Sequence, residues 1–421
     1  MDSRLAKQVV ESLRKGVPPQ RGVDLYSVGN EKLIEGVKRF HLSAISDGGI
    51  IRFVSGSWGA GKTHFFRLLR DVAFKAECLV SNVELNVNDA PLNKFELVFY
   101  SIVRNIATPS YYAGGNEQQA APFGTVLAES LAFLSSGTRS LSPPLPHDQY
   151  TKAVDALMGN SVMDIDFKKI VQEYWKTFLP DAGDPTLLQQ TREEILQWFS
   201  GEGQRTVYQR KYGINKMINR QDAKLMLQSL AAFVRLSGYK GLLILFDEAE
   251  QSYSIMRKSA LRGAHDNLRS LIDNIENVRG VFLIYATTPD FYTDPTHGIV
   301  IYGALSGRVG KPDDKPPKAL DIIWNLDAVQ PELPEYQQAA AKVATLYRAA
   351  YSGDAAPTAA ADENLSEFVS ELYQMHPSLS AVRFWRVLVT ALIRRFDDEL
   401  EGEVRPVAEL YHDVMKNLRE E

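Results

Sequence analysis

The sequence predicts an α/β protein with a three-layer core, in which a parallel sheet is covered by helices. Short runs of apolar residues, such as Ile50–Gly56, Leu242–Phe246 and the run that begins at Gly280, read as strands without polar alternation. Strands that are apolar on both faces are typical of parallel sheets buried between helices. Helical spacing of apolar residues follows the first run, in "THFFRLLRDVAFKA". We therefore expect strand–helix units, with additional helical parts elsewhere in the chain.

A glycine-rich segment joins the first strand to the first of these helices. Gly56, Gly61, Lys62 and Thr63 match the pattern G-x-x-x-x-G-K-[ST] at every fixed position. Glycines allow backbone N–H groups to surround phosphates, the lysine reaches the β- and γ-phosphates, and the threonine hydroxyl binds Mg²⁺. The pattern is typical of P-loop NTPases and predicts ATP and Mg²⁺ as ligands. The residues expected to bind nucleotide here are Gly56, Ser57, Trp58, Gly59, Ala60, Gly61, Lys62, Thr63 and His64.

Two further strand ends carry polar residues that suit hydrolysis. The apolar run in "GLLILFDEAE" ends at Asp247 and Glu248, where an aspartate would join the Mg²⁺ shell and a glutamate would deprotonate the attacking water. The run in "GVFLIYATT" ends at Thr287 and Thr288, which could contact the γ-phosphate or the water, although threonines often end strands for structural reasons alone. Lys62, Glu248, Thr287 and Thr288 are therefore predicted to be catalytic, and Thr63 and Asp247 to bind Mg²⁺.

Composition sets the broad class. The 421 residues carry a net charge of −5 and a single cysteine, Cys78, which excludes an internal disulfide and a cysteine-built zinc site. The N-terminal pattern "MDSRLAKQVVESLRKG" has no apolar signal region, and no run approaches the roughly 20 apolar residues that span a bilayer. We expect a cytoplasmic protein without a membrane segment.

The chain between Lys62 and Asp247 is far longer than one strand and one or two helices require. We therefore expect residues 1–107 and 221–310 to form the ATPase core, 108–220 a mainly helical insertion, and 311–421 a C-terminal helical lid or winged-helix-like domain. Within the insertion, "QRTVYQRKYGINKMINRQDAK" gathers basic residues and two tyrosines. Such a segment can follow a nucleic-acid backbone, but a solvated helix pair is the more common meaning.

The order of these motifs resembles that of the AAA+ ATPases, particularly the branch related to origin-binding ATPases. Several stretches of the sequence are similar to those of the ATP-binding proteins of BREX phage-defence systems (BrxD-like). They are "GVPPQRGVDLYSVGNEKL", "GSWGAGKTHFFRLL", "GYKGLLILFDEAE", "ATTPDFYTDPTHGIVIYGALSGRV" and "RFWRVLV". The resemblance implies an arginine finger at Arg308, acting on a neighbouring subunit. It also implies a nucleotide-sensing arginine in the lid, Arg383 or else Arg386. Gly29 and Asn30 fall where relatives carry Gly-Arg-Glu near the adenine, with Asn30 in place of the arginine.

Two functions remain open from the sequence. One is an oligomeric ATPase that couples hydrolysis to remodelling of DNA or a DNA-bound partner in anti-phage defence. The other is a slow nucleotide-dependent switch or scaffold that recruits an effector such as a helicase. The acidic pair and Arg308 favour the first, whereas the lack of a strong DNA-binding motif supports the second.

Overall fold

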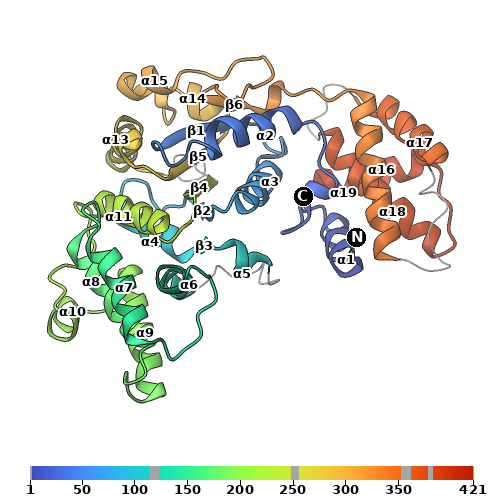
Figure 1. Ribbon diagram of the computed structural model, residues 1–421. Helices are drawn as coiled ribbons and strands as arrows, with labels where there is room; N and C mark the ends of the chain where they lie inside the picture. Colours follow the sequence, from blue (N-terminus) through green and yellow to red (C-terminus); the bar gives the residue numbers. More distant parts are fainter. Residues whose placement is uncertain (1, 114–122, 248–255, 352–361, 378–382, 421) are drawn as a thin grey trace.

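The computed structural model describes residues 2–113, 123–247, 256–351, 362–377 and 383–420. Figure 1 shows a central sheet with its helices, a helical part formed by the middle of the chain, and a bundle of C-terminal helices on the other side. The N-terminal helix lies in that bundle rather than beside the sheet. The chain therefore has an α/β centre between two helical parts.

The sheet has six strands in the order β3-β2-β4-β5-β1-β6, and all its pairs are parallel except β2 with β3. The three strands expected from apolar runs are confirmed as β1, β4 and β5, and the parallel sheet is confirmed with them. β5 lies between β1 and β4, so the carboxyl ends of these three strands meet at one edge. The bounds are β1 Ile50–Ser55, β2 Leu79–Glu84, β3 Ile106–Ala107, β4 Leu242–Asp247, β5 Val281–Thr287 and β6 Ile323–Asn325.

Both faces of the sheet are buried, which explains why the strands read as continuous apolar runs. Alternate residues such as Phe53 and Ile244 join the hydrophobic core that includes α4, α11 and α13. Their neighbours, such as Val54 and Leu243, join a second core with α2 and α3. Because successive side chains of a strand point to opposite faces, these two cores define the helix–sheet–helix layers. The helices are α2 Glu31–Val37, α3 Lys62–Lys75, α4 Phe95–Arg104, α11 Ala223–Leu236, α13 Lys258–Asn274, α14 Asp290–Thr293 and α15 Gly303–Val309.

The segment between β3 and α11 is mainly helical in the part that the structure describes. Its helices bury Trp175 and Trp198 completely, in the same continuous core as one face of the sheet. Asp164 and Asp184 begin two of the helices, each accepting two backbone N–H groups of the first turn. The helices are α5 Pro109–Ala113, α6 Phe123–Ser136, α7 His147–Met158, α8 Ile165–Lys176, α9 Pro185–Phe199 and α10 Arg205–Tyr212.

The C-terminal bundle has its own hydrophobic core, and the N-terminal helix completes it. Val9 and Val10 of α1 are fully buried in that core, and the Arg14 guanidinium is paired with Asp397 at 2.7 Å. The division of the chain into four ranges stays a prediction, but α1 packs with the last range rather than with the sheet. Among the described helices, none is long and apolar enough to cross a bilayer. The bundle consists of α1 Ser3–Arg14, α16 Leu333–Ala350, α17 Asp362–Met375, α18 Phe384–Leu400 and α19 Val407–Glu420.

Candidate nucleotide site

The glycine-rich segment forms a tight loop between β1 and α3. Gly56 is buried, and a Cβ there would lie 2.9 Å from the Ala60 Cβ, so only glycine fits. Gly59 and Gly61 have φ of +77° and +91°, values that side chains with a Cβ rarely adopt. α3 begins directly after Gly61 and has no side-chain cap on its first N–H groups. These uncapped donors and the positive end of the helix dipole make the loop a suitable anion site.

The lysine of the loop folds back over it. Lys62 Nζ donates to the Gly56 carbonyl at 2.7 Å and lies 3.4 Å from the Ser57 carbonyl. It also lies 5.9 Å from the centre of the Trp58 ring, whose residue is 69% exposed. The ammonium group is therefore held at the inner side of the loop, where phosphate oxygens would replace the carbonyls as its partners.

Oxygen ligands suitable for Mg²⁺ lie on the same cavity. Asp247, the last residue of β4, is 7% exposed, and Thr63, in the first turn of α3, is exposed; both line the cavity beside Lys62. Among the described residues, no group of three or more His, Cys, Asp or Glu side chains gathers as a metal cluster. Mg²⁺ at triphosphates needs only one or two protein oxygens, since phosphate and water supply the others. A carboxylate and a hydroxyl beside a phosphate loop fit that requirement.

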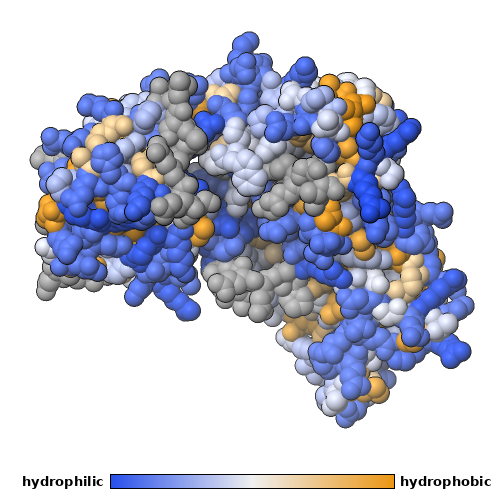
Figure 2. Space-filling model, turned by 180° about the vertical axis from the view of Figure 1, so that it is seen from behind, coloured by the Kyte–Doolittle hydropathy of each residue, from blue (hydrophilic) through white to orange (hydrophobic). Residues whose placement is uncertain are grey.

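The cavity has a volume of about 480 Å³ and lies between the core and the C-terminal bundle. Figure 2 shows the surface hollowed between these two parts of the molecule when it is seen from behind. Its walls come from the phosphate loop, the segment that precedes α2, and helices α16 and α18 of the C-terminal bundle. Of the predicted residues, the cavity lining includes Gly29, Asn30, Ser57, Trp58, Gly59, Ala60, Gly61, Lys62, Thr63, His64, Asp247, Arg383 and Arg386.

His64 connects helix α3, which follows the phosphate loop, to the segment expected near the adenine base. His64 Nδ1 lies 3.2 Å from the Tyr26 hydroxyl, and its Nε2 lies 3.1 Å from the Ser27 hydroxyl. Burial, with a smaller contribution from the charge of Arg67, lowers the pKa of His64 to about 4. Lys342 of α16 donates to the Ser27 carbonyl at 2.7 Å. The segment before Gly29 is thus held by a neutral imidazole from the core and by an ammonium group from the C-terminal bundle.

Three predicted catalytic residues lie away from this cavity, and a fourth cannot be placed. Thr287 is fully buried and its hydroxyl is hydrogen-bonded with the Val54 carbonyl at 3.2 Å and the Tyr292 hydroxyl at 2.9 Å. Thr288 is 6% exposed, and neither threonine lines the cavity. Arg308 lies outside it as well. Glu248 lies outside the described residues, and only the sequence shows that it follows Asp247.

Arg308 is on the surface, on the far side of the sheet from the lid. Its Nε donates to Asp273 of α13 and its Nη1 to the Ala304 carbonyl. The hydrogen bond with Asp273 raises the pKa of the Arg308 guanidinium. Figure 1 shows α15, which carries Arg308, on the opposite side of the molecule from α16–α19. The side chain is 40% exposed, so it is accessible to another molecule but not to its own phosphate loop.

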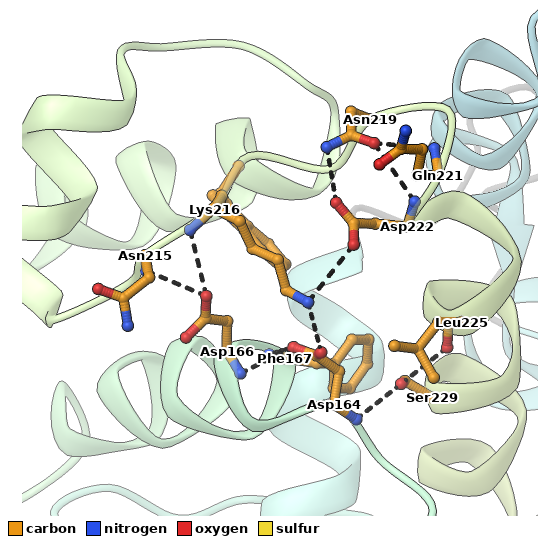
Figure 3. Close-up of polar contacts among 11 residues, drawn as sticks. Asp164, Asp166, Phe167, Asn215, Lys216, Asn219, Gln221, Asp222, Leu225 and Ser229 are labelled. Atoms are coloured by element: carbon orange, nitrogen blue, oxygen red, sulfur yellow. Dashed lines mark hydrogen bonds and ion pairs between the residues drawn. The ribbon is translucent and has the colours of Figure 1, made fainter.

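The basic segment of the insertion is largely occupied by internal contacts. Figure 3 shows Lys216 between Asp164, 2.8 Å from Nζ, and Asp222, at 3.5 Å. Asp166, which is 2% exposed, accepts the backbone N–H groups of Asn215 and Lys216 through one oxygen, at 3.0 and 3.2 Å. These contacts bind the segment to α8 and leave Lys216 with structural partners.

The same holds for neighbours of Lys216. Lys211 is paired with Glu194 at 2.5 Å, and Arg205 donates to the Asn215 carbonyl at 2.8 Å. Tyr208 is 1% exposed, and its hydroxyl donates to the Glu194 carbonyl at 2.8 Å. A buried tyrosine cannot stack on a base, so Tyr208 does not offer a stacking platform for nucleic acid.

A glycine loop at a helix N-terminus, a lysine folded over it and a strand-end aspartate on one cavity define a P-loop nucleotide-binding protein. The family model described as "BREX system ATP-binding protein BrxC/D" matches residues 1–414. The chain therefore belongs to this family of ATP-binding proteins of phage-defence systems, and the resemblance read from the sequence is confirmed. No curated protein and no solved structure matches the chain.

Proposed function

We propose that this chain binds ATP with Mg²⁺ and hydrolyses it, and that hydrolysis drives the protein's part in anti-phage defence. The observation that carries the proposal is the meeting of Lys62, Thr63 and Asp247 on one cavity, although Asp247 lies far from the other two in sequence. Parallel strands bring their carboxyl ends to the same edge, which is where β1 and β4 deliver these groups.

The residues divide the work by their chemistry. The loop N–H groups and Lys62 bind the β- and γ-phosphates, and Thr63 and Asp247 hold Mg²⁺, which neutralises charge on the phosphates when bound. Glu248 follows Asp247 directly and is proposed to deprotonate the attacking water. The Thr287 hydroxyl is hydrogen-bonded inside the fold, so Thr287 is proposed to have a structural role rather than a catalytic one.

Arg308 is proposed to act on a second copy of the chain. It lies outside the cavity of its own chain and is 40% exposed, and its helix α15 is on the opposite side of the molecule from α16–α19. A cation that assists phosphoryl transfer must reach the γ-phosphate, so the phosphate it serves belongs to a neighbour. This arrangement implies a homo-oligomer with sites shared between subunits.

A slow switch that recruits an effector such as a helicase is the second candidate. The observation that favours it is the internal pairing of Lys211 and Lys216, which gives these two cations of the basic segment partners within the fold. In this alternative, closure of the C-terminal bundle around ATP changes the conformation that a partner recognises. Hydrolysis of ATP then only returns the protein to its starting conformation.

Phosphate release measured with and without duplex DNA tests both candidates. A rate of ATP turnover that DNA raises supports the remodelling ATPase. A slow rate that is the same with and without DNA supports the switch. Lys62→Ala is expected to abolish tight ATP binding in calorimetry, because the phosphates lose their nearest cation. Unchanged affinity in that variant would refute the nucleotide site itself. The matched control is Lys75→Ala at the other end of α3, where the ammonium pairs with Asp24 at 2.7 Å outside the cavity.

A further inference from the structure

A carboxylate that no sequence motif marks lies between the phosphate loop and the lid. Asp327 follows β6, in the short turn Leu326–Ala328 that leads to α16. The Asn325 side chain accepts its backbone N–H at 3.1 Å, which fixes the turn. The Asp327 side chain is 22% exposed, so solvent weakens its ionic interactions less than it would on an open surface.

The two oxygens of Asp327 have partners on different parts of the protein. Oδ2 accepts from the Ser57 backbone N–H at 2.9 Å and from the Ser57 hydroxyl at 2.7 Å. Oδ1 accepts from Arg383 Nη2 in an ion pair. Ser57 belongs to the phosphate loop, and Arg383 is the residue that precedes α18 of the lid. One carboxylate therefore connects the loop to the lid arginine.

Arg383 itself lies against the phosphate loop. Its Cγ would be 3.9 Å from a Cβ placed on Gly59, and it lines the same cavity as Lys62. A guanidinium carries five N–H donors in a planar fork, and Asp327 engages one nitrogen of it. Arg383 can thus bind a phosphate without giving up Asp327.

We propose that Asp327 is a positioning residue for the triphosphate site, which holds Arg383 over the phosphate loop and keeps that arginine oriented for the γ-phosphate. The proposal rests on the proposed nucleotide site. Asp327 acts through Arg383 and through the loop, and does not touch the phosphates itself, where its charge would be repelled. Without Asp327, the Arg383 side chain has to be ordered when ATP binds. This ordering costs part of the free energy of binding, so ATP binds more weakly.

A double-mutant cycle on the full chain tests this role. Affinities for a non-hydrolysable ATP analogue and for ADP are measured with Mg²⁺ by calorimetry, for the wild type, Asp327→Asn, Arg383→Ala and the double variant. We expect Asp327→Asn to weaken analogue binding by about tenfold and ADP binding by less. The double variant is expected to bind like Arg383→Ala alone, because Asp327 has nothing left to orient.

Matched variants separate this role from general damage to the fold. Asp314→Asn makes the same charge change at an exposed position outside the cavity, and is expected to bind as the wild type does. Ser57→Ala removes only the hydroxyl contact with Asp327 and is expected to give a smaller loss of the same sign. If Asp327→Asn fails to fold, the cycle of Ser57→Ala with Arg383→Ala tests the same coupling.

The outcomes distinguish this proposal from the nucleotide site on which it rests. Binding by the wild type that is lost in Lys62→Ala, together with unchanged or tighter binding by Asp327→Asn, overturns the role of Asp327 alone. Losses that multiply in the double variant also overturn it, since the two residues would then act independently. A wild-type chain that binds neither nucleotide overturns both proposals.

Discussion

His64 is expected to make the stability of the folded chain depend on acid. Both its ring nitrogens have partners in the folded chain, and burial lowers its pKa to about 4 from an ordinary value of about 6.5. The unfolded chain therefore binds a proton at His64 between those two pH values, whereas the folded chain does not. The contribution to stability is complete above pH 6.5 and is lost as the pH falls toward 4.

The size of the effect follows from the shift. A difference of this size corresponds to about 3 kcal/mol when the loss is complete, and to about 2 kcal/mol between pH 7 and pH 5. His265 also has its pKa lowered to about 4 by burial and adds a similar slope, so the wild type should lose more than His64 alone explains. His64→Gln cannot take up a proton, and its unfolding free energy should fall by about 2 kcal/mol less over that range.

Urea denaturation at pH 7, 6 and 5 measures this difference. The wild type should show the steeper pH dependence, and His64→Gln a shallower one. Equal slopes for the two proteins would refute the neutral state of His64 in the folded chain.

Three further outcomes are expected. Glu248→Gln should bind ATP normally and turn it over roughly 10²-fold more slowly or worse, in single-turnover assays; near wild-type turnover would exclude Glu248 as the base. Arg308→Ala should also bind ATP but lose on the order of 10³-fold in rate, and mixing it with Lys62→Ala should restore activity that neither has alone. A mixture that assembles and stays inactive would argue against action between subunits. Asp164→Ala should cost about 2 kcal/mol in urea denaturation, since Asp164 caps α8 and pairs with a lysine. The control Asp184→Ala, a cap with no described ion pair, should cost about 1 kcal/mol; equal losses would mean that the ion pair adds nothing.

The motif residues of the phosphate loop could be predicted because their roles are local. The positive φ of Gly59 and Gly61 and the start of α3 at Lys62 depend on residues a few positions apart. Continuous apolar runs likewise predicted β1, β4 and β5, since strands buried on both faces need no polar alternation. The resemblance gave Arg383 or else Arg386 as the nucleotide-sensing arginine, and both line the cavity.

Other parts of the site could not be predicted, because they depend on residues brought together only by folding. The sequence of the basic segment leaves a nucleic-acid surface and a solvated helix pair open, and only the structure shows Asp164 and Asp222 around Lys216. The N-terminal position of α1 suggests a place in the core, yet its buried valines pack in the C-terminal bundle. In both cases a charge or an apolar stripe was visible in the sequence, but its partner was not.

The sequence by itself determined that this chain has a parallel α/β core with a phosphate loop, because backbone conformation and the burial pattern of a strand are set by neighbouring residues. Tertiary structure alone decided which contacts join the parts of the site. Asp327, His64 and Lys342 connect the loop, the segment before α2 and the lid through hydrogen bonds and an ion pair. Such bonds form over about 3 Å between residues far apart in the chain, so only the packing of the lid against the core brings them within reach.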